Sequence, residues 1–490
     1  MHVVTKNNEY YYDNDIGLIL PYSKIMRDIL NIDNWNERTS EEIISLLSNK
    51  YNSTKIIFYY KWLKKYHYFR NNILEESNYE NQNRVLLNKS NIEDYILKNG
   101  LTQLILSVTE DCNFRCTYCT FSEDFSSNRN HSTKYMDFKT SKKAIDLYLN
   151  YINRGKKYNL FRSPVICFYG GEPLLNFDLI EKSVEYVHSN YGEDVKFNIT
   201  TNGYLLDKNI SDWLMKNEFM ITVSLDGDEK EQNRKRINKN GKGTFNKVFS
   251  NIKYILNKKY EHFYVSPVFD YTTSFSDCHN FFKSNLIKVL SLSEVDTEYT
   301  YDYYRRFTEN DYENYIKLIK ELIENYSIEN TSSSYLYYLI EEPFVKLIFE
   351  SNILSFSRNF VNFTGSCVPG DKLFVSTEGN FYTCERVPPT DISNIGNINV
   401  GLDFDKIVNI ITNFNCKLKE CSYCNISTLC QKCYKQFIDG YDFKEAKILC
   451  SNSENETKQF ISSALSFLEK HQINLENKHI RYEKLYDWRD

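Results

Sequence analysis

The sequence lacks any run of about 18 apolar residues, so we expect no segment that crosses a membrane. Its first residues, MHVVTKNNEYYYDN, have no apolar core behind a basic start, so we expect no secretory signal. It also lacks an excess of positive charge, because 60 Lys and Arg stand against 65 Asp and Glu. This balance argues against nucleic acid or an anionic membrane as a partner. Together these absences predict a cytoplasmic protein.

Cysteine, in contrast, is plentiful and clustered. Of 13 cysteines, three lie within Cys112–Cys119 and eight within Cys367–Cys450. Cys167 and Cys278 stand apart, and we expect both to be buried structural thiols. Because a reducing cytoplasm disfavours a disulfide framework, the clustered thiols indicate metal ligation.

The chain is too long for one compact core, so we expect several domains. From about residue 100, apolar runs alternate with helical periods, which predicts a parallel sheet covered by helices. The expected fold class is α/β: a partial (βα)6 TIM-like barrel, a small N-terminal α+β domain and a C-terminal Cys-rich iron–sulfur domain. The expected boundaries are 1–95 for the N-terminal domain and linker, 96–310 for the barrel, 311–365 for connecting helices, 366–455 for the Cys-rich domain, and 456–490 for a closing helix and tail.

Individual elements are also predicted. In the barrel, strands are expected at 104–108, 165–169, 195–200, 221–225 and 264–269, and helices at 141–152, 179–187, 211–216 and 245–256. The N-terminal domain should hold strands at 9–13 and 17–20 and helices at 25–30, 41–51 and 56–66, with a capping box of Thr39 and Glu42. Residues 76–95 are polar and predict a linker. Further helices are expected within 312–350 and at 455–472. Residues 366–450 show little periodicity, so we expect metal rather than apolar packing to hold them together.

The first cysteine cluster has the spacing CxxxCxxC directly after a strand and consists of Cys112, Cys116 and Cys119. A tetrahedral zinc ion would need a fourth ligand close by, and among nearby His and Cys residues only His131 follows. A cubane of four irons held by three thiolates instead leaves one iron free to bind a cofactor. We favour the cubane, with zinc or a chance loop as the alternatives.

Polar residues follow three later strands at the rim where parallel strands end. The motifs are Gly170-Gly171-Glu172-Pro173, then Thr201-Asn202-Gly203, then Asp226-Gly227 with Arg236 beyond. Glycine lets a ligand approach the backbone closely, and a carboxylate can bind a ligand ammonium. A tight βα turn explains any one motif, but their convergence predicts a ligand site.

The stretches SVTEDCNFRCTYC, FYGGEPLL, ITTNGYLL and VSLDG followed by NRKRINKNGKGTF resemble the radical S-adenosylmethionine (SAM) superfamily over about 100–275. The resemblance implies that Cys112, Cys116 and Cys119 hold a catalytic 4Fe–4S cluster whose open iron binds SAM. It implies an enzyme that cleaves SAM to methionine and a 5′-deoxyadenosyl radical, which abstracts hydrogen from a substrate. The implied SAM-binding residues are Tyr118, Gly170, Gly171, Glu172, Asn202, Ser224 and Arg236, with Glu172 and the two glycines at the SAM ammonium.

The second cysteine cluster contains CxxCxxxxxCxxC, which on spacing alone suits zinc. Together with the other late cysteines it resembles the SPASM extension, which carries two auxiliary 4Fe–4S clusters in peptide-modifying radical SAM enzymes. The resemblance implies one cluster on Cys421, Cys424, Cys430 and Cys450, and another on Cys367, Cys384 and Cys433. This chain has two residues before Cys433 where the family usually has three. The fourth position of the second cluster is either filled by Cys416 or open to a substrate thiolate.

Residues 1–95 resemble the winged-helix-like leader-recognition element of maturases for ribosomally made peptides (RiPPs), which binds a leader as an added strand. The alternative is a structural cap on the barrel. We therefore expect a radical SAM peptide maturase that cross-links a precursor peptide, with a thioether favoured. A flavodoxin- or ferredoxin-type electron donor is the other expected partner.

Two rivals remain. One is an anaerobic sulfatase-maturing enzyme that forms formylglycine; the 95 residues before the triplet count against it. The other is a non-catalytic iron–sulfur electron-transfer or zinc-scaffold protein, which leaves the strand-end residues unexplained.

Overall fold

The computed structural model describes most of the chain. The described residues are 1–13, 18–75, 87–121, 130–158, 163–192, 194–295, 301–327, 334–344, 367–417, 424–426, 429–430, 432–439, 442–445, 450 and 453–471. The largest element is a nine-stranded sheet in the order β14-β13-β12-β11-β4-β5-β6-β7-β8. In this part of the chain, no helix is both long and apolar enough to cross a membrane.

Five strands of this sheet are consecutive and parallel: β4 (Leu104–Thr109), β5 (Val165–Gly170), β6 (Lys196–Thr201), β7 (Met220–Val223) and β8 (Phe263–Val265). Every residue of β4 is buried, as expected for a strand covered on both faces. Beyond Pro267, which has no N–H to donate, the chain resumes as β9 (Val268–Phe269) and pairs in parallel with β10 (Ser293–Glu294). The segment around Val289 and β10 thus forms a sixth strand position next to β8 and β9, and a parallel bridge between Val265 and Val289 belongs to it. This sixth position confirms the partial barrel.

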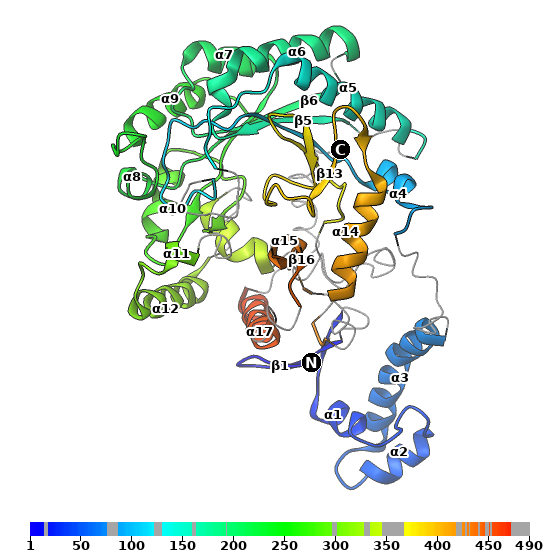
Figure 1. Cartoon of the computed structure of the whole chain (residues 1–490). Helices are drawn as coiled ribbons and strands as arrows, with labels where there is room; N and C mark the ends of the chain where they lie inside the picture. Colours follow the sequence, from blue (N-terminus) through cyan, green and yellow to red (C-terminus); the bar gives the residue numbers. More distant parts are fainter. Residues whose placement is uncertain are drawn as a thin grey trace.

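Helices cover the outer side of the barrel sheet (Figure 1). They are α5 (Phe138–Gly155), α6 (Phe177–Tyr191), α7 (Lys208–Lys216), α9 (Phe245–Asn257) and α10 (Phe275–Ser284). The first four confirm the predicted helices with wider bounds, whereas α10 and the short α8 (Glu229–Lys235) were not anticipated. α8 shows no apolar period because its buried residues are Glu231, Gln232 and Lys235.

Part of the predicted linker is a helix. α4 (Ile92–Asn99) buries Ile92, Ile96 and Leu97 and packs against α5. The prediction was wrong here because three apolar residues among polar neighbours were too few to stand out. Residues 76–86 of the predicted linker lie outside the described residues.

The Cys-rich region begins with an extension of the barrel sheet. β11 (Leu373–Val375) pairs in parallel with β4, and β12 (Asn380–Tyr382), β13 (Asn394–Asn397) and β14 (Gly401–Leu402) continue from it. α14 (Phe404–Lys417) buries Ile407, Ile411 and Phe414 in the same apolar core as the barrel. The expectation that metal rather than apolar packing holds this region was therefore wrong for 367–417, because strands of two to four residues are too short to show a period. Farther on lie α15 (Tyr434–Phe437), β15 (Ile438–Asp439) and β16 (Asp442–Phe443).

The N-terminal domain consists of a small sheet and three helices. β1 (His2–Val4), β2 (Glu9–Asp13) and β3 (Leu18–Pro21) form an antiparallel sheet in that order, followed by α1 (Lys24–Leu30), α2 (Ser40–Leu47) and α3 (Ser53–Glu75). The capping box of Thr39 and Glu42 is confirmed. The strand β1 was not anticipated, and Gly17 of the predicted second strand lies outside the described residues.

Two separate apolar cores divide this domain. Ile29, Ile43 and Ile56 pack among the three helices, which stand apart from the barrel in Figure 1. Val3 and Tyr12 of the sheet instead pack with the C-terminal helix α17 (Ser453–His471). Between the barrel and the Cys-rich region, the described chain forms α11 (Tyr301–Tyr304), α12 (Glu309–Asn325) and the π-helical turn η2 (Tyr337–Glu341).

A single carboxylate joins the small sheet to α17. Glu469 accepts hydrogen bonds from Thr5 Oγ1 (2.9 Å), Asn8 Nδ2 (2.8 Å) and Tyr10 OH (2.7 Å). These bonds, added to the apolar core, fix the first strands of the chain on its last described helix.

Candidate functional site

The loop that carries Cys112, Cys116 and Cys119 is held from two sides. On one side, Gly171 N donates to Thr109 O and Glu172 N to Asp111 O, both at 2.9 Å. On the other side, Arg115 N donates to Ile237 O (2.7 Å) and Thr117 N to Lys235 O (2.9 Å). The loop therefore lies between the end of β5 and the segment that follows α8.

The paired glycines after β5 are required by this docking. A Cβ on Gly170 would lie 2.2 Å from Thr109 O, and a Cβ on Gly171 would lie 2.3 Å from Asp111 O. Both oxygens belong to the backbone and cannot move aside easily. Gly170 also has a φ of +141°, which side chains disfavour. From the sequence, we explained the two glycines by a ligand that comes close to their backbone. The structure shows that the backbone of the cysteine loop also comes close to them.

A cavity of about 520 Å³ opens at the carboxyl ends of the parallel strands. All ten residues predicted for the cluster and for SAM line it, although they come from four separate stretches of the chain. They are Cys112, Cys116, Tyr118, Cys119, Gly170, Gly171, Glu172, Asn202, Ser224 and Arg236. The topology thus brings together what the motifs predicted.

Cys112 is buried, Cys116 and Cys119 are half-buried, and all three are free thiols in the metal-free protein. Burial raises the pKa of Cys116 to about 12 and also raises the pKa values of Cys112 and Cys119. Binding of iron by these thiols must release protons. Within the described residues, no three or more His, Cys, Asp or Glu side chains converge closely enough to hold a single metal ion.

Glu172 connects the ends of β5 and β6. Its carboxylate accepts hydrogen bonds from Thr201 Oγ1 (2.6 Å), Asn202 N (2.7 Å) and Leu174 N (3.1 Å). Burial raises its pKa to about 7 despite these bonds. A carboxylate has about four acceptor positions, so roughly one remains for a ligand donor in the cavity.

A buried ionic group lies behind Arg236. The Asp226 carboxylate is 3.1 Å from Arg236 Nε and 3.7 Å from Lys235 Nζ, and it accepts a hydrogen bond from Tyr118 OH (3.1 Å). The Arg236 guanidinium lies 5.3 Å from the centre of the Tyr118 ring. The sequence analysis placed Asp226 among the polar residues at the strand ends, but it did not predict the buried ion pairs of Asp226 or single out Lys235.

Two asparagines on β6 and the turn after it serve different purposes. Asn202 Nδ2 donates to Asn113 Oδ1 (2.7 Å), so this side chain points to the cysteine loop. Asn198 lines the cavity and is 8% exposed, and its Oδ1 has no hydrogen-bond partner among the described residues. A buried acceptor without a donor is costly, so a polar ligand suits this cavity. The site thus combines three thiols that can bind iron, an acceptor position on Glu172 and a cavity with polar walls. These features fit a cluster with bound SAM.

The described late cysteines fall into two sets. Burial raises the pKa of Cys433 to about 11, and the neighbouring thiols of Cys384 and Cys367 contribute to this shift. Burial also raises the pKa of Cys430, with contributions from Cys450 and Cys424. These neighbours are members of the two predicted sets, and the ligand sets themselves stay predictions.

The other cysteines differ in their surroundings. Cys421 lies outside the described residues, and Cys416 is exposed near the end of α14. Cys278 and Cys167 are both buried, as predicted, but Cys167 also lines the cavity. Three charged residues that flank β11 and Cys384 line it as well and were missed by the sequence analysis: Lys372, Glu385 and Arg386.

Known proteins resemble parts of this chain. The radical SAM superfamily model matches residues 106–274. An uncharacterised protein of Methanocaldococcus jannaschii is 41% identical over 130 residues, which are 26% of this chain and 40% of that protein. A cysteine-type anaerobic sulfatase-maturating enzyme of Clostridium novyi is 28% identical over 195 residues, 39% of this chain and 50% of the enzyme. The chain thus spans half or less of the length of these curated relatives.

A solved structure supports the same fold. Native anSMEcpe with bound AdoMet matches with a TM-score of 0.56 and 20% identity, over 74% of this chain and 99% of that one. At this identity the match shows the fold alone.

Proposed function

We propose that this chain is a radical SAM peptide maturase with a SPASM-type extension, a proposal supported by the match of the radical SAM superfamily model to residues 106–274. When bound, the 4Fe–4S cluster and SAM supply one-electron cleavage of SAM and removal of a hydrogen atom from the substrate. The observation that carries the proposal is the single cavity lined by the three cysteines and the strand-end residues.

The cavity residues divide the work of binding. Cys112, Cys116 and Cys119 hold the cluster. Glu172 offers its remaining acceptor position to the SAM ammonium, beside the backbone of Gly170 and Gly171.

Further lining residues are proposed to hold the rest of the cofactor. Ser224 and the Arg236 guanidinium bind its ribose or carboxylate. Tyr118 packs beside the cluster, and Asn202 acts on the cysteine loop that it contacts.

The two sets of late cysteines are proposed to hold auxiliary clusters. Cys421, Cys424, Cys430 and Cys450 hold one, and Cys367, Cys384 and Cys433 hold the other. We favour an open fourth position on the second cluster, where a substrate thiolate binds, over ligation by the exposed Cys416. Glu385 follows Cys384 directly and lines the cavity, so a substrate there lies between the catalytic and auxiliary clusters.

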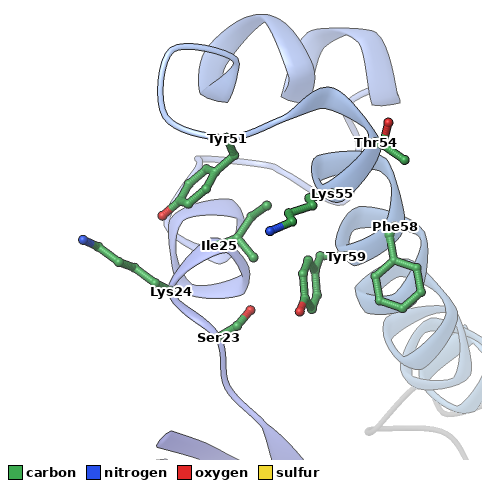
Figure 2. A pocket seen from close by; sticks show the side chains of 8 residues that line it. All are labelled: Ser23, Lys24, Ile25, Tyr51, Thr54, Lys55, Phe58 and Tyr59. Atoms are coloured by element: carbon green, nitrogen blue, oxygen red, sulfur yellow. The ribbon is translucent and has the colours of Figure 1, made fainter.

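A groove in the N-terminal domain is proposed to bind the leader of the precursor peptide. It has a volume of about 500 Å³ and lies between α1 and α3. In Figure 2, Ile25, Lys55 and Tyr59 gather in the space between the two helices, with Phe58 at one side. Phe58 is 61% exposed, and Lys24 and Lys55 add positive charge. An apolar leader residue next to an acidic one suits this groove.

Two products are consistent with such a site. A thioether cross-link is favoured because an open auxiliary iron can hold the substrate thiolate and accept an electron. Formylglycine formation is the alternative, and the similarity to a cysteine-type sulfatase-maturating enzyme favours it. Mass spectrometry of a co-expressed precursor peptide separates them, since a thioether retains the cysteine sulfur and formylglycine loses it. A flavodoxin- or ferredoxin-type protein is the proposed electron donor.

The proposal is tested with Cys116→Ala in anaerobically reconstituted protein. We expect no release of 5′-deoxyadenosine from SAM and dithionite, while the auxiliary iron is retained. Cys278→Ala, which removes a buried thiol outside all three sets, should leave release unchanged. Release by Cys116→Ala at the wild-type rate would contradict the proposed catalytic cluster, and loss of all iron would contradict separate sites.

A further inference from the structure

Each of the three thiols at the cavity has a nitrogen-bearing side chain near it, and the three side chains come from different parts of the chain. Asn202 Nδ2 lies 3.9 Å from Cys112 Sγ, and His131 Nε2 lies 3.9 Å from Cys119 Sγ. The Arg236 guanidinium lies close enough to the Cys116 thiol for its charge to lower the pKa of that thiol. Asn202 and Arg236 also line the cavity, whereas His131 is absent from its described lining.

The position of His131 is fixed by its own backbone. His131 N donates to Phe121 O (2.9 Å), just beyond Cys119. The imidazole reaches the Cys119 sulfur, although His131 is not among the described residues that line the cavity. The contact that the structure shows is with the sulfur of Cys119.

We propose that His131 is a positioning residue that donates an Nε2–H···S hydrogen bond to Cys119 and raises the reduction potential of the catalytic cluster. This inference rests on the proposed ligation of that cluster by the three cysteines. Donors to ligand sulfurs stabilise the more negative, reduced cluster more than the oxidised one, so they make reduction easier. Asn202 and Arg236 act in the same direction on Cys112 and Cys116.

The competing role for His131 is direct ligation. The spacing CxxxCxxC offers three thiolates, and an imidazole nitrogen could take the fourth iron. That role would close the iron to SAM, and it would place a nitrogen in the coordination sphere. The two roles predict different spectra for the same reconstituted protein.

The test is an electron paramagnetic resonance (EPR) redox titration of the anaerobically reconstituted full chain, following the signal that responds to SAM. His131→Ala should lower its midpoint potential, and His131→Gln, which restores an N–H donor, should bring it back toward the wild-type value. His262→Ala removes a histidine elsewhere in the barrel, beside Tyr260, and should leave the potential unchanged. Equal potentials for wild type, His131→Ala and His131→Gln would overturn the inference.

Isotopic labelling separates the two roles of His131. In protein labelled with ¹⁵N-histidine, we expect a weak nitrogen coupling on the SAM-responsive signal, lost in His131→Ala. A coupling as large as that of a metal-bound imidazole, or SAM binding gained in His131→Ala, would overturn the hydrogen-bond role. If the wild-type protein gave no SAM-responsive signal, the proposed function and this inference would both be overturned. If the signal is present but its potential does not depend on His131, only this inference is overturned.

Discussion

Arg236 Nε lies 3.1 Å from Asp226 Oδ2, and the Asp226 side chain is completely closed to solvent. The same carboxylate accepts hydrogen bonds from Tyr118 OH (3.1 Å) and from Val268 N (3.0 Å). Asp226 thus fixes two side chains of the cavity, Arg236 and Tyr118, to the ends of two strands. Its charge also offsets that of Lys235, which is fully buried as well.

Asp226→Asn should therefore destabilise the protein strongly. The change removes the negative charge that Asp226 provides to the buried cations of Lys235 and Arg236. Breaking a buried ion pair in this way typically lowers the free energy of unfolding by about 3–5 kcal/mol. The matched control is Asp212→Asn, whose half-exposed side chain lies 3.9 Å from Lys258 and should contribute less than about 1 kcal/mol. Urea unfolding of the metal-free proteins measures both, and equal losses would contradict a structural role for the buried group.

The pH dependence of stability should carry a contribution from Glu172. Its pKa is raised from 4.5 to about 7 in the folded protein by burial. Between these values the folded state keeps a proton that the unfolded state has lost, so the free energy of unfolding falls as pH rises. The full effect is roughly 3 kcal/mol and is complete above about pH 7.

Glu172→Gln removes this titration. The decline in the free energy of unfolding between pH 4.5 and 7 should be shallower in the variant than in the wild type. Urea unfolding of metal-free protein at several pH values gives the two slopes. Parallel slopes would show that Glu172 titrates as an ordinary exposed carboxyl.

Phe58→Ala should weaken leader binding without affecting SAM. Truncating an exposed aromatic anchor in a binding groove typically costs 1–2 kcal/mol or more, which is about tenfold in Kd. Leu46→Ala is the control, because Leu46 is also exposed in this domain, at 48%, but does not line the groove. Calorimetric titration with a synthetic leader of the neighbouring precursor peptide measures Kd. Unchanged affinity in Phe58→Ala would place the leader elsewhere.

The barrel strands and the rim of the cavity were predictable because their causes are local or topological. Strands such as β4 are mostly apolar and buried throughout, and parallel strands place their ends at one edge. These two facts were sufficient to bring Glu172, Asn202 and Ser224 to one cavity.

What could not be predicted depends on packing between distant segments. Lys235 has the sequence pattern of a solvated helix residue, yet it is buried because Glu231 and Asp226 compensate its charge. Short strands such as β11 form only because β4 offers an edge. The contact of His131 with Cys119 crosses a stretch that shows no secondary-structure pattern in the sequence, so spacing could not reveal it.

The central claim is that three thiols hold a cubane whose fourth iron is open to SAM. Mössbauer spectroscopy of ⁵⁷Fe-reconstituted protein, recorded with and without SAM, tests it directly, since the difference spectrum cancels the auxiliary clusters. The account predicts that one iron in a single cubane changes its parameters when SAM binds, and that Cys116→Ala abolishes the change. A difference spectrum without any shifted iron, in protein that holds a full complement of iron, would contradict it.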